Sequence, residues 1–137
     1  SAKALIEMRY NDDGLFSKIF YVQQHINRPP RDIRTVVVGN EVVGAEYRYS
    51  SNDDWRTNFS LGAKIENCPI TKELEEIVLK ASDSVGGGIL GVDLMEGEDG
   101  FLVHEINNNV EFKGVSKFTK DNIAYKIVDY IDHISKR

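Results

Sequence analysis

Three oxygen-bearing side chains have the chemistry of a metal site: Asp93 lies in one apolar segment, and Glu105 and Asn107 lie in the next. Both segments, residues 89–95 and 101–107, have the composition of β-strands and predict a hairpin. Two carboxylates directly opposite each other on an apolar hairpin repel each other and are costly to desolvate. A hard divalent cation removes both penalties, and a site completed by phosphate oxygens and water suits Mg²⁺. A solvated hairpin face, or a carboxyl pair that shares one proton, would explain the same spacing without a metal.

The register of this hairpin decides whether the three donors meet. A three-residue turn at residues 98–100 would place a glycine at the left-handed position that such a turn requires. In that register Asp93 pairs with Glu105. Because side chains alternate along a strand, Asp93, Glu105 and Asn107 would share one face, and a slip of one residue would separate them.

Two arginines form a second candidate group, because guanidinium groups bind phosphates and carboxylates. Arg34 and Arg48 lie on two β-branched segments that flank Gly39-Asn40 and predict another hairpin. A two-residue turn would put these arginines on opposite faces, whereas a three-residue turn that includes Glu41 would put them on the same face. The phosphate hypothesis requires the same face, and ordinary surface arginines are the alternative.

The periodicity of the sequence predicts the elements that must position these residues. Residues 71–85 predict a helix that Thr71 caps and that residues 86–88, all glycine, terminate. A second, amphipathic helix is expected from about residue 121. Strands are expected at residues 19–26, 33–38, 41–49, 89–95 and 101–107. This order predicts one α+β domain over residues 1–137, a mainly antiparallel sheet of hairpins packed against helices.

Composition limits the classes of function. The chain has 137 residues, of which 41% are hydrophobic and 28% charged, and this fits one folded domain. A net charge of -5 with scattered basic residues argues against nucleic-acid binding. No apolar run approaches the roughly 18–20 residues of a membrane span. The single cysteine, Cys68, is expected to be structural and fits a reducing, cytoplasmic location.

The three histidines lie on separate predicted elements, at His25, His104 and His133, and none has a second ligand at metal-binding spacing. By strand alternation, His104 is expected to face away from Asp93 and Glu105. We therefore expect all three histidines to be structural.

Several short segments resemble the C-terminal half of ATP-grasp ligases of the RimK and LysX branch. Asp-Ile-Arg at residues 32–34 and Glu-x-Asn at residues 105–107, with Asp93 upstream, resemble the branch as a whole. Glu-Asn-Cys-Pro at residues 66–69 and Glu-Phe-Lys at residues 111–113 resemble LysX and its arginine-pathway sister ArgX more narrowly. Further similar segments are residues 21–26, 36–39 and 92–94. The resemblance implies the C-terminal ATP-grasp subdomain, with the N-terminal domain and the lysine-bearing ATP-grasp half outside residues 1–137.

The resemblance also implies roles for individual residues, with ATP and Mg²⁺ as cofactors. Asp93, Glu105 and Asn107 would be the Mg²⁺ ligands, and Arg34 and Arg48 would lie near the reacting phosphate and carboxylate. The implied ATP contacts are Gln23, Gln24, His25, Ile26 and Asn58, and the implied amino-acid contacts are Asn58, Asn108, Asn109, Glu111 and Phe112.

A two-step reaction follows from the resemblance. ATP converts a carboxylate into an acyl phosphate, and the amine of an amino acid then displaces phosphate to form an amide. In this family the carboxylate is the C-terminal glutamate of LysW, a small acidic carrier protein. The amine belongs to an amino-dicarboxylate, which is 2-aminoadipate for LysX and glutamate for ArgX. Complete enzymes of this type are commonly homo-oligomers, and this chain alone is expected not to turn over.

One departure affects the substrate, because Asn108-Asn109-Val110 stands where LysX proteins typically carry His-Thr-Met. Glutamate is therefore an alternative to 2-aminoadipate. Two other hypotheses compete with this ligase: a RimK-type enzyme that adds glutamate to a ribosomal protein, and a non-enzymatic Mg²⁺-binding or regulatory module. Residues 66–69 argue against the RimK-type enzyme.

Overall fold

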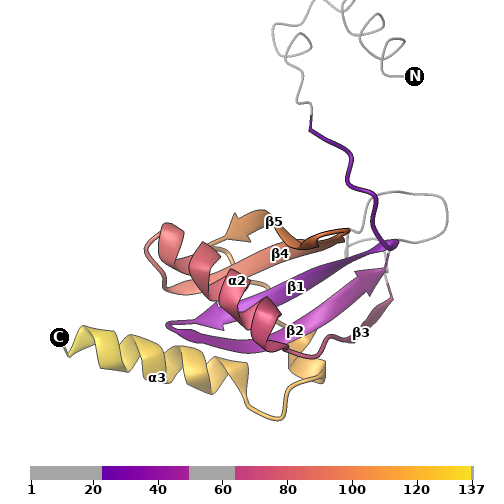
Figure 1. Cartoon of the computed structure of the whole chain (residues 1–137). Coiled ribbons are helices and arrows are strands. Elements are labelled where there is room, and N and C mark those ends of the chain that lie inside the picture. Colours follow the sequence, from indigo (N-terminus) through magenta and orange to yellow (C-terminus); the bar gives the residue numbers. More distant parts are fainter. Residues whose placement is uncertain (1–22, 50–63, 137) are drawn as a thin grey trace, which may run out of the picture.

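One antiparallel sheet organises the part of the chain that the computed structural model describes, residues 23–49 and 64–136. The strand order is β3-β2-β1-β4-β5, so the two predicted hairpins lie side by side through β1 and β4 (Figure 1). The strands are β1 Arg31–Val38, β2 Glu41–Tyr49, β3 Ile65–Asn67, β4 Ile89–Gly97 and β5 Gly100–Asn107. The predicted α+β class and the mainly antiparallel hairpins are confirmed.

Helix α2, Lys72–Ser84, covers one face of the sheet. Its first turn is capped as expected, because the Thr71 hydroxyl accepts a hydrogen bond from the Leu74 N–H at 3.2 Å. Leu74 and Val78 are buried against strand residues that include Val92. The helix ends where three successive glycines, residues 86–88, adopt positive φ angles that other residues rarely adopt.

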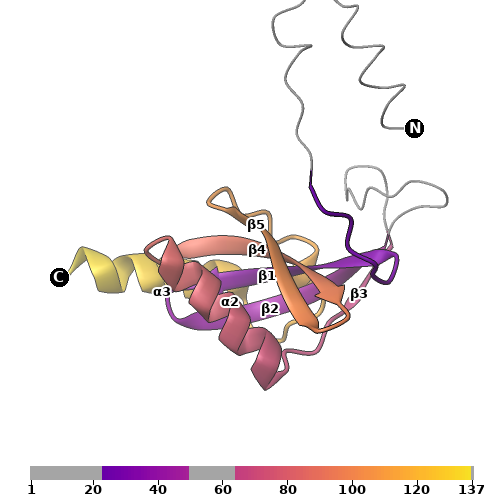
Figure 2. The same ribbon diagram turned by 45° about the horizontal axis from the view of Figure 1, so that its top comes forward.

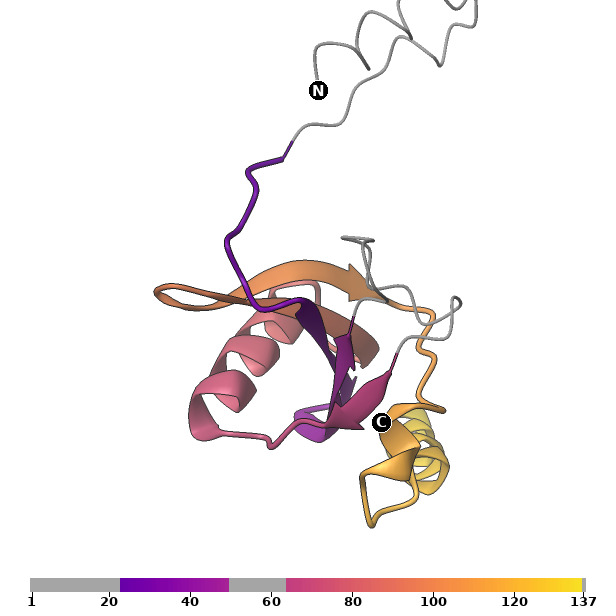
Figure 3. The ribbon, with the colours of Figure 1, turned by 90° about the vertical axis from the view of Figure 1, so that its right-hand side faces the viewer.

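Helix α3, Ile123–Ser135, lies on the opposite face of the sheet (Figure 3). The short 3-10 helix η3, Val115–Lys117, precedes it, and Asn122 caps α3 by accepting hydrogen bonds from two backbone N–H groups. A second, smaller core forms on this side, with Val36 of β1, Val115 and Ile123 among its buried residues. Figure 2 shows the two helices separated by the sheet. None of the helices in the described residues is long and apolar enough to cross a membrane.

The structure differs from the prediction at two strands. The strand predicted at residues 19–26 is wrong for its described part, because residues 23–26 have no regular secondary structure. Strand β3 was not predicted, since its three residues are too few to show an alternating pattern. It lies at the edge of the sheet, where it pairs antiparallel with the end of β2.

Candidate functional site

The face of the sheet opposite α2 carries the predicted arginines, and a β-bulge brings them together. Val38 pairs with Glu41, so the turn at Gly39-Asn40 has two residues, and the three-residue turn required by the phosphate hypothesis is wrong. The register then shifts between Val36 and Val37, because β2 contains one extra residue there. The shift pairs Arg34 with Glu46 and Asp32 with Arg48. Arg34 and Arg48 therefore do lie on the same face, as expected.

A second bulge has the same effect in the β4–β5 hairpin. Gly97 pairs with Gly100, so this turn also has two residues, and the predicted three-residue turn is wrong. A register shift between Asp93 and Leu94 then restores the predicted pairing of Asp93 with Glu105. Asn107 pairs with Gly91, two residues from Asp93. Because two residues along a strand return to the same face, all three predicted metal ligands lie on one side of the sheet.

His104 is the extra residue of the second bulge. The alternation that would have turned His104 away from Asp93 and Glu105 is interrupted at this residue. Burial raises the pKa of Asp32, and the charges of Arg28, Arg48 and His104 oppose that rise. The imidazole of His104 therefore acts electrostatically on Asp32.

Asp93 is the centre of the site. Its Oδ1 atom lies 2.7 Å from Arg34 Nε and 2.7 Å from Arg48 Nη2, and the residue is only 7% exposed. Burial nevertheless raises the pKa of Asp93, although both arginines oppose this. The arginines thus leave part of the cost of burying this negative charge uncompensated. Gly91 makes the arrangement possible, since a Cβ atom there would lie 2.5 Å from Arg34 Nη1.

The predicted metal ligands fit a hard divalent cation. Asp93 and Glu105 are directly opposed carboxylates, and Asn107 adds an amide oxygen on the same face. All three are oxygen donors, which Mg²⁺ prefers. Burial disfavours the negative charge of Asp93 and raises its pKa. An added cation would offset the same penalty by its positive charge. Within residues 23–49 and 64–136, no cluster of three or more His, Cys, Asp or Glu side chains has metal-binding geometry.

Glu46 belongs to this site, although the sequence analysis did not select it. It is 4% exposed, lies opposite Arg34 in the register, and its Oε2 atom is buried without a hydrogen-bond partner among residues 23–49 and 64–136. Burial raises its pKa, while the charges of Arg48, Arg34 and Lys117 oppose the rise. A charged residue in the middle of a β-branched strand is the sequence signal that could have identified it.

The predicted amino-acid contacts follow β5 but differ in exposure. Asn108, Asn109 and Glu111 are exposed, whereas Phe112 is half-buried and packs against the second core. Phe112 thus has a structural role in the chain as described. The segment continues to Gly114, which is buried against Glu46, because a Cβ atom at Gly114 would collide with the Glu46 carboxylate. The segment after β5 therefore reaches the arginine cluster at its far end.

The predicted ATP contacts lie before β1. Gln23, Gln24 and His25 are exposed and Ile26 is half-buried, while Asn58 lies outside the described residues. Adjacent contacts hold this segment to the second hairpin: Asn27 Nδ2 donates to Glu98 Oε1 at 3.3 Å. The structure does not bring residues 23–26 into contact with the Asp93 cluster.

Arg31 holds the start of β1 in place. It forms two hydrogen bonds with the Glu96 carboxylate, at 2.6 Å and 2.8 Å, and its guanidinium lies 3.8 Å from the centre of the Tyr47 ring. These contacts link the beginning of β1 to β2 and to the end of β4. These contacts lie on the face of the sheet that α2 covers, opposite to Asp93, because Arg31 shares the face of the buried Ile33 and Tyr47 packs against the same core.

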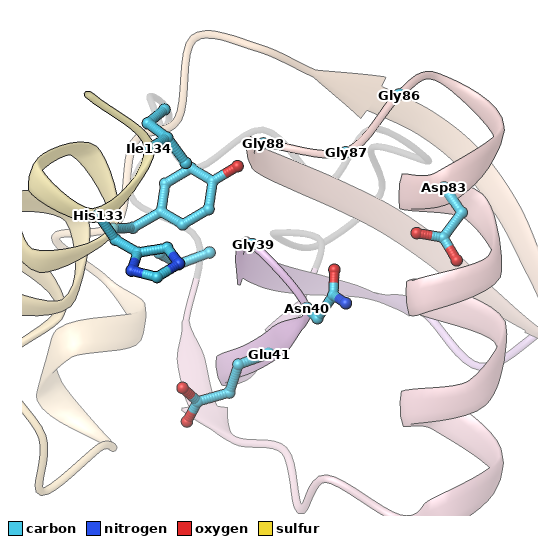
Figure 4. Close-up of a pocket in the computed structure, with 11 residues that line it drawn as sticks. Gly39, Asn40, Glu41, Asp83, Gly86, Gly87, Gly88, His133 and Ile134 are labelled. Atoms are coloured by element: carbon cyan, nitrogen blue, oxygen red, sulfur yellow. The ribbon is translucent and has the colours of Figure 1, made fainter. Parts of the chain in front are cut away.

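A separate hollow of about 550 Å³ lies at the other end of the sheet (Figure 4). It is bounded by the β1–β2 turn, the glycines after α2, and α3, with Asn40, Asp83 and His133 among the labelled side chains. None of the predicted site residues lines it. The candidate site is therefore the cluster around Asp93, and this hollow is distinct from it.

Comparisons with known proteins agree with the fold and the motifs. A family model described as a RimK-like ATP-grasp domain matches residues 2–131. The chain is 43% identical over 115 residues to the tetrahydromethanopterin:alpha-L-glutamate ligase of Methanocaldococcus jannaschii, covering 82% of this chain and 39% of that protein. It is 41% identical over 110 residues to the alpha-aminoadipate–LysW ligase LysX of Saccharolobus solfataricus, covering 80% of this chain and 40% of that protein.

A third relative matches over nearly the whole chain. The glutamate–LysW ligase ArgX of Sulfolobus acidocaldarius is 34% identical over 130 residues, which is 94% of this chain and 46% of that protein. The chain thus spans less than half the length of these three relatives.

Solved structures are similar to this chain in fold. The ATP-grasp ligase PsnB, in a complex with a minimal precursor, Mg and ADP, matches with a TM-score of 0.62 and 23% identity, covering 81% of this chain and 34% of that chain. The macrocyclase MdnC from Microcystis aeruginosa, bound to its precursor peptide MdnA, matches with a TM-score of 0.55 and 17% identity, covering 75% and 33%. At these identities the likeness is one of fold.

Proposed function

Because this chain belongs to the RimK-like ATP-grasp family, we propose that it forms the metal- and substrate-binding part of an ATP-dependent ligase that joins an amino-dicarboxylate to a carboxylate through an amide bond. One observation carries the proposal. A buried carboxylate, Asp93, meets two arginines and directly opposes a second carboxylate, Glu105, on one face of the sheet. This arrangement concentrates groups that bind phosphates, carboxylates and a hard cation.

The first step of the proposed reaction transfers the γ-phosphoryl group of ATP to an acceptor carboxylate. A carboxylate oxygen forms the new bond to phosphorus, the bond to the ADP oxygen breaks, and ADP leaves with the electron pair. Arg34 and Arg48 stabilise the charge that spreads over the transferring group. Asp93, Glu105 and Asn107 would hold Mg²⁺, which supplies neutralisation of phosphate charge.

The second step forms the amide. The amine nitrogen attacks the acyl carbon, the carbon–oxygen bond to phosphate breaks, and the amine loses a proton. The chain needs no nucleophile of its own for this step, because the acyl phosphate is already activated. Its contribution is to align the amine with the acyl carbon and to exclude water.

The amine substrate is proposed to be 2-aminoadipate, with the C-terminal glutamate of an acidic LysW-like carrier as the acceptor. Glutamate is the second candidate, for two reasons. Asn108-Asn109-Val110 departs from the LysX pattern, and both ArgX and the Methanocaldococcus jannaschii relative are named for glutamate. The name of the Methanocaldococcus jannaschii relative also makes tetrahydromethanopterin an alternative acceptor.

A chimera tests the proposal, since the chain spans only part of its relatives. Residues 2–131 replace the matching segment of the Sulfolobus acidocaldarius ArgX, and the product is incubated with ATP, Mg²⁺ and LysW. Separate reactions contain 2-aminoadipate or glutamate, and mass spectrometry of the carrier reads the result. We expect the carrier to gain one amino-acid residue, and no gain with either amino acid would overturn the proposal.

The same chimera tests the metal assignment. Asp93→Asn is expected to abolish ligation while the circular dichroism spectrum stays unchanged, because the side chain keeps its shape but loses the charge that a cation needs. Glu41→Gln, an exposed carboxylate at the far end of β2, is the control and should retain activity. Normal turnover by Asp93→Asn would remove Asp93 from the metal site.

A further inference from the structure

Two buried polar atoms on β2 have no hydrogen-bond partner in the part of the chain described here: Glu46 Oε2 and Arg48 Nε. They belong to residues two positions apart in one strand, so their side chains share a face and start about 6.6 Å apart along it. One atom is an acceptor on an anion, and the other is a donor on a cation. Unpaired buried polar atoms are uncommon, and each calls for an explanation such as a bound ligand, ion or water, or a catalytic role.

The neighbouring charges do not satisfy this pair. Arg48 uses Nη2 to bind Asp93 at 2.7 Å, and Arg34 uses Nε to bind the same oxygen. Arg34 pairs with Glu46 in the register, yet no ion pair within 4.0 Å joins these two described residues. Glu46 therefore stays beside two arginines without bonding either of them.

The two unpaired atoms together match the head of an amino acid. An ammonium group donates hydrogen bonds and carries a positive charge, which suits the Glu46 carboxylate. An α-carboxylate accepts hydrogen bonds and carries a negative charge, which suits the Arg48 guanidinium. A ligand with both groups would satisfy both atoms at once, whereas a phosphate or a simple carboxylate would leave Glu46 unpaired and would be repelled by it.

We propose, on the basis of the ligase function above, that Glu46 and Arg48 hold the zwitterionic head of the amino-acid substrate. Glu46 accepts hydrogen bonds from the ammonium group, and the Arg48 Nε–H donates to the carboxylate. Glu46 is thus a binding residue that selects an amine-bearing substrate and places the amine beside the arginine cluster. Both atoms are covered by protein in this structure, so the residues around them, Gly114 among them, would have to move for the amino acid to enter.

The test separates amine binding from activation of the acceptor. The chimera is assayed with ATP, Mg²⁺ and LysW in two ways: with the amino acid at varied concentration, and with hydroxylamine, which is uncharged at neutral pH and traps an acyl phosphate as a hydroxamate. Glu46→Gln keeps the size of the side chain and removes its charge. We expect this variant to raise the KM for the amino acid by about 10- to 100-fold, as for loss of a hydrogen bond to a charged group. Hydroxamate formation and the KM for ATP should stay within about twofold of the parent.

Two further variants make the result specific. Glu41→Gln makes the same substitution at an exposed position of the same strand and should leave the KM for the amino acid unchanged. Glu46→Asp keeps the charge on a shorter side chain and should recover part of the affinity for the amino acid. This second variant still tests the role of the charge if Glu46→Gln folds poorly. A KM for Glu46→Gln within twofold of the parent would overturn the inference and leave the ligase function standing. Absence of hydroxamate with the parent chimera would instead overturn the proposed function.

Discussion

Replacing Glu46 by Gln is expected to make the chain more stable at neutral pH, which is unusual for a substitution at a buried position. Glu46 is 4% exposed, and its Oε2 atom lacks a partner among the described residues. Leaving a buried acceptor unsatisfied costs roughly 1–3 kcal/mol, and more for a charged group. Arg48, Arg34 and Lys117 return part of this by attraction, yet burial still raises the pKa of Glu46. We therefore expect Glu46→Gln to raise the free energy of unfolding at pH 7 by about 1 kcal/mol, or roughly 4 °C in Tm.

The pH dependence gives the sign of the effect independently. A carboxyl with a raised pKa in the folded state favours folding while it is protonated, and this contribution is lost as pH rises through the folded pKa. Both proteins carry a neutral side chain below the unfolded pKa of about 4.3, so the advantage of Glu46→Gln should disappear there. Urea denaturation of the 137-residue chain at pH 7 and near pH 4 measures both values. Glu41→Gln, at an exposed ion pair with Lys126, should lose no more than about 0.5 kcal/mol. Destabilisation of Glu46→Gln at pH 7 would mean that Glu46 forms a favourable ion pair, and the reasoning would fail.

Three other substitutions test the packing around the site. Gly114→Ala should lower the free energy of unfolding by about 1–3 kcal/mol, because its Cβ atom collides with the Glu46 carboxylate, and Glu46→Ala should suppress most of the loss in a double-mutant cycle. Arg31→Ala should cost about 1–2 kcal/mol by removing the paired hydrogen bonds to Glu96, and an unchanged urea midpoint would show that this contact is not stabilising. Thr71→Ala should lower the free energy of unfolding by about 1 kcal/mol through loss of the cap of α2. Thr71→Ser keeps a hydroxyl at the cap and should lower it much less, and thermal denaturation of both variants measures the difference.

The sequence predicted the two hairpins but not how each of them turns, nor how they pair with each other through β1 and β4. Both turns were expected to have three residues, and both have two. In each hairpin a bulge adds the residue that the turn lacks, so the pairings beyond the bulge agree with the prediction. Arg34 and Arg48 share a face for this reason, as do Asp93 and Glu105. A bulge depends on packing across the sheet, and the two extra residues, Val43 in β2 and His104 in β5, share no composition that would reveal it.

The register predicted for the first hairpin was already sufficient to place Glu46 opposite Arg34. The three-residue turn that put Arg34 and Arg48 on one face also places Glu46 opposite Arg34, which is the pairing observed. The sequence analysis examined the arginines and overlooked the acid between them. What the sequence did not contain is the position of Gly114, because the path of the segment after β5 depends on contacts between residues far apart in the chain.

The charges of the site would also allow Asp93 to bind both the arginines and the proposed cation. The closest contacts of Arg34 and Arg48 both use the Oδ1 atom of Asp93, and its pKa remains raised, so the two positive charges do not compensate its burial. A divalent cation held between Asp93 and Glu105 would supply the missing compensation and weaken the hold of Asp93 on the guanidinium groups. The arginines would then be able to turn toward anionic substrates, while Glu46, which is outside the proposed metal ligands, would keep its negative charge for the amine. This division would leave Asp93 and Glu105 to the cation and Glu46 to the amine, and it would account for a buried acid that the fold alone would be more stable without.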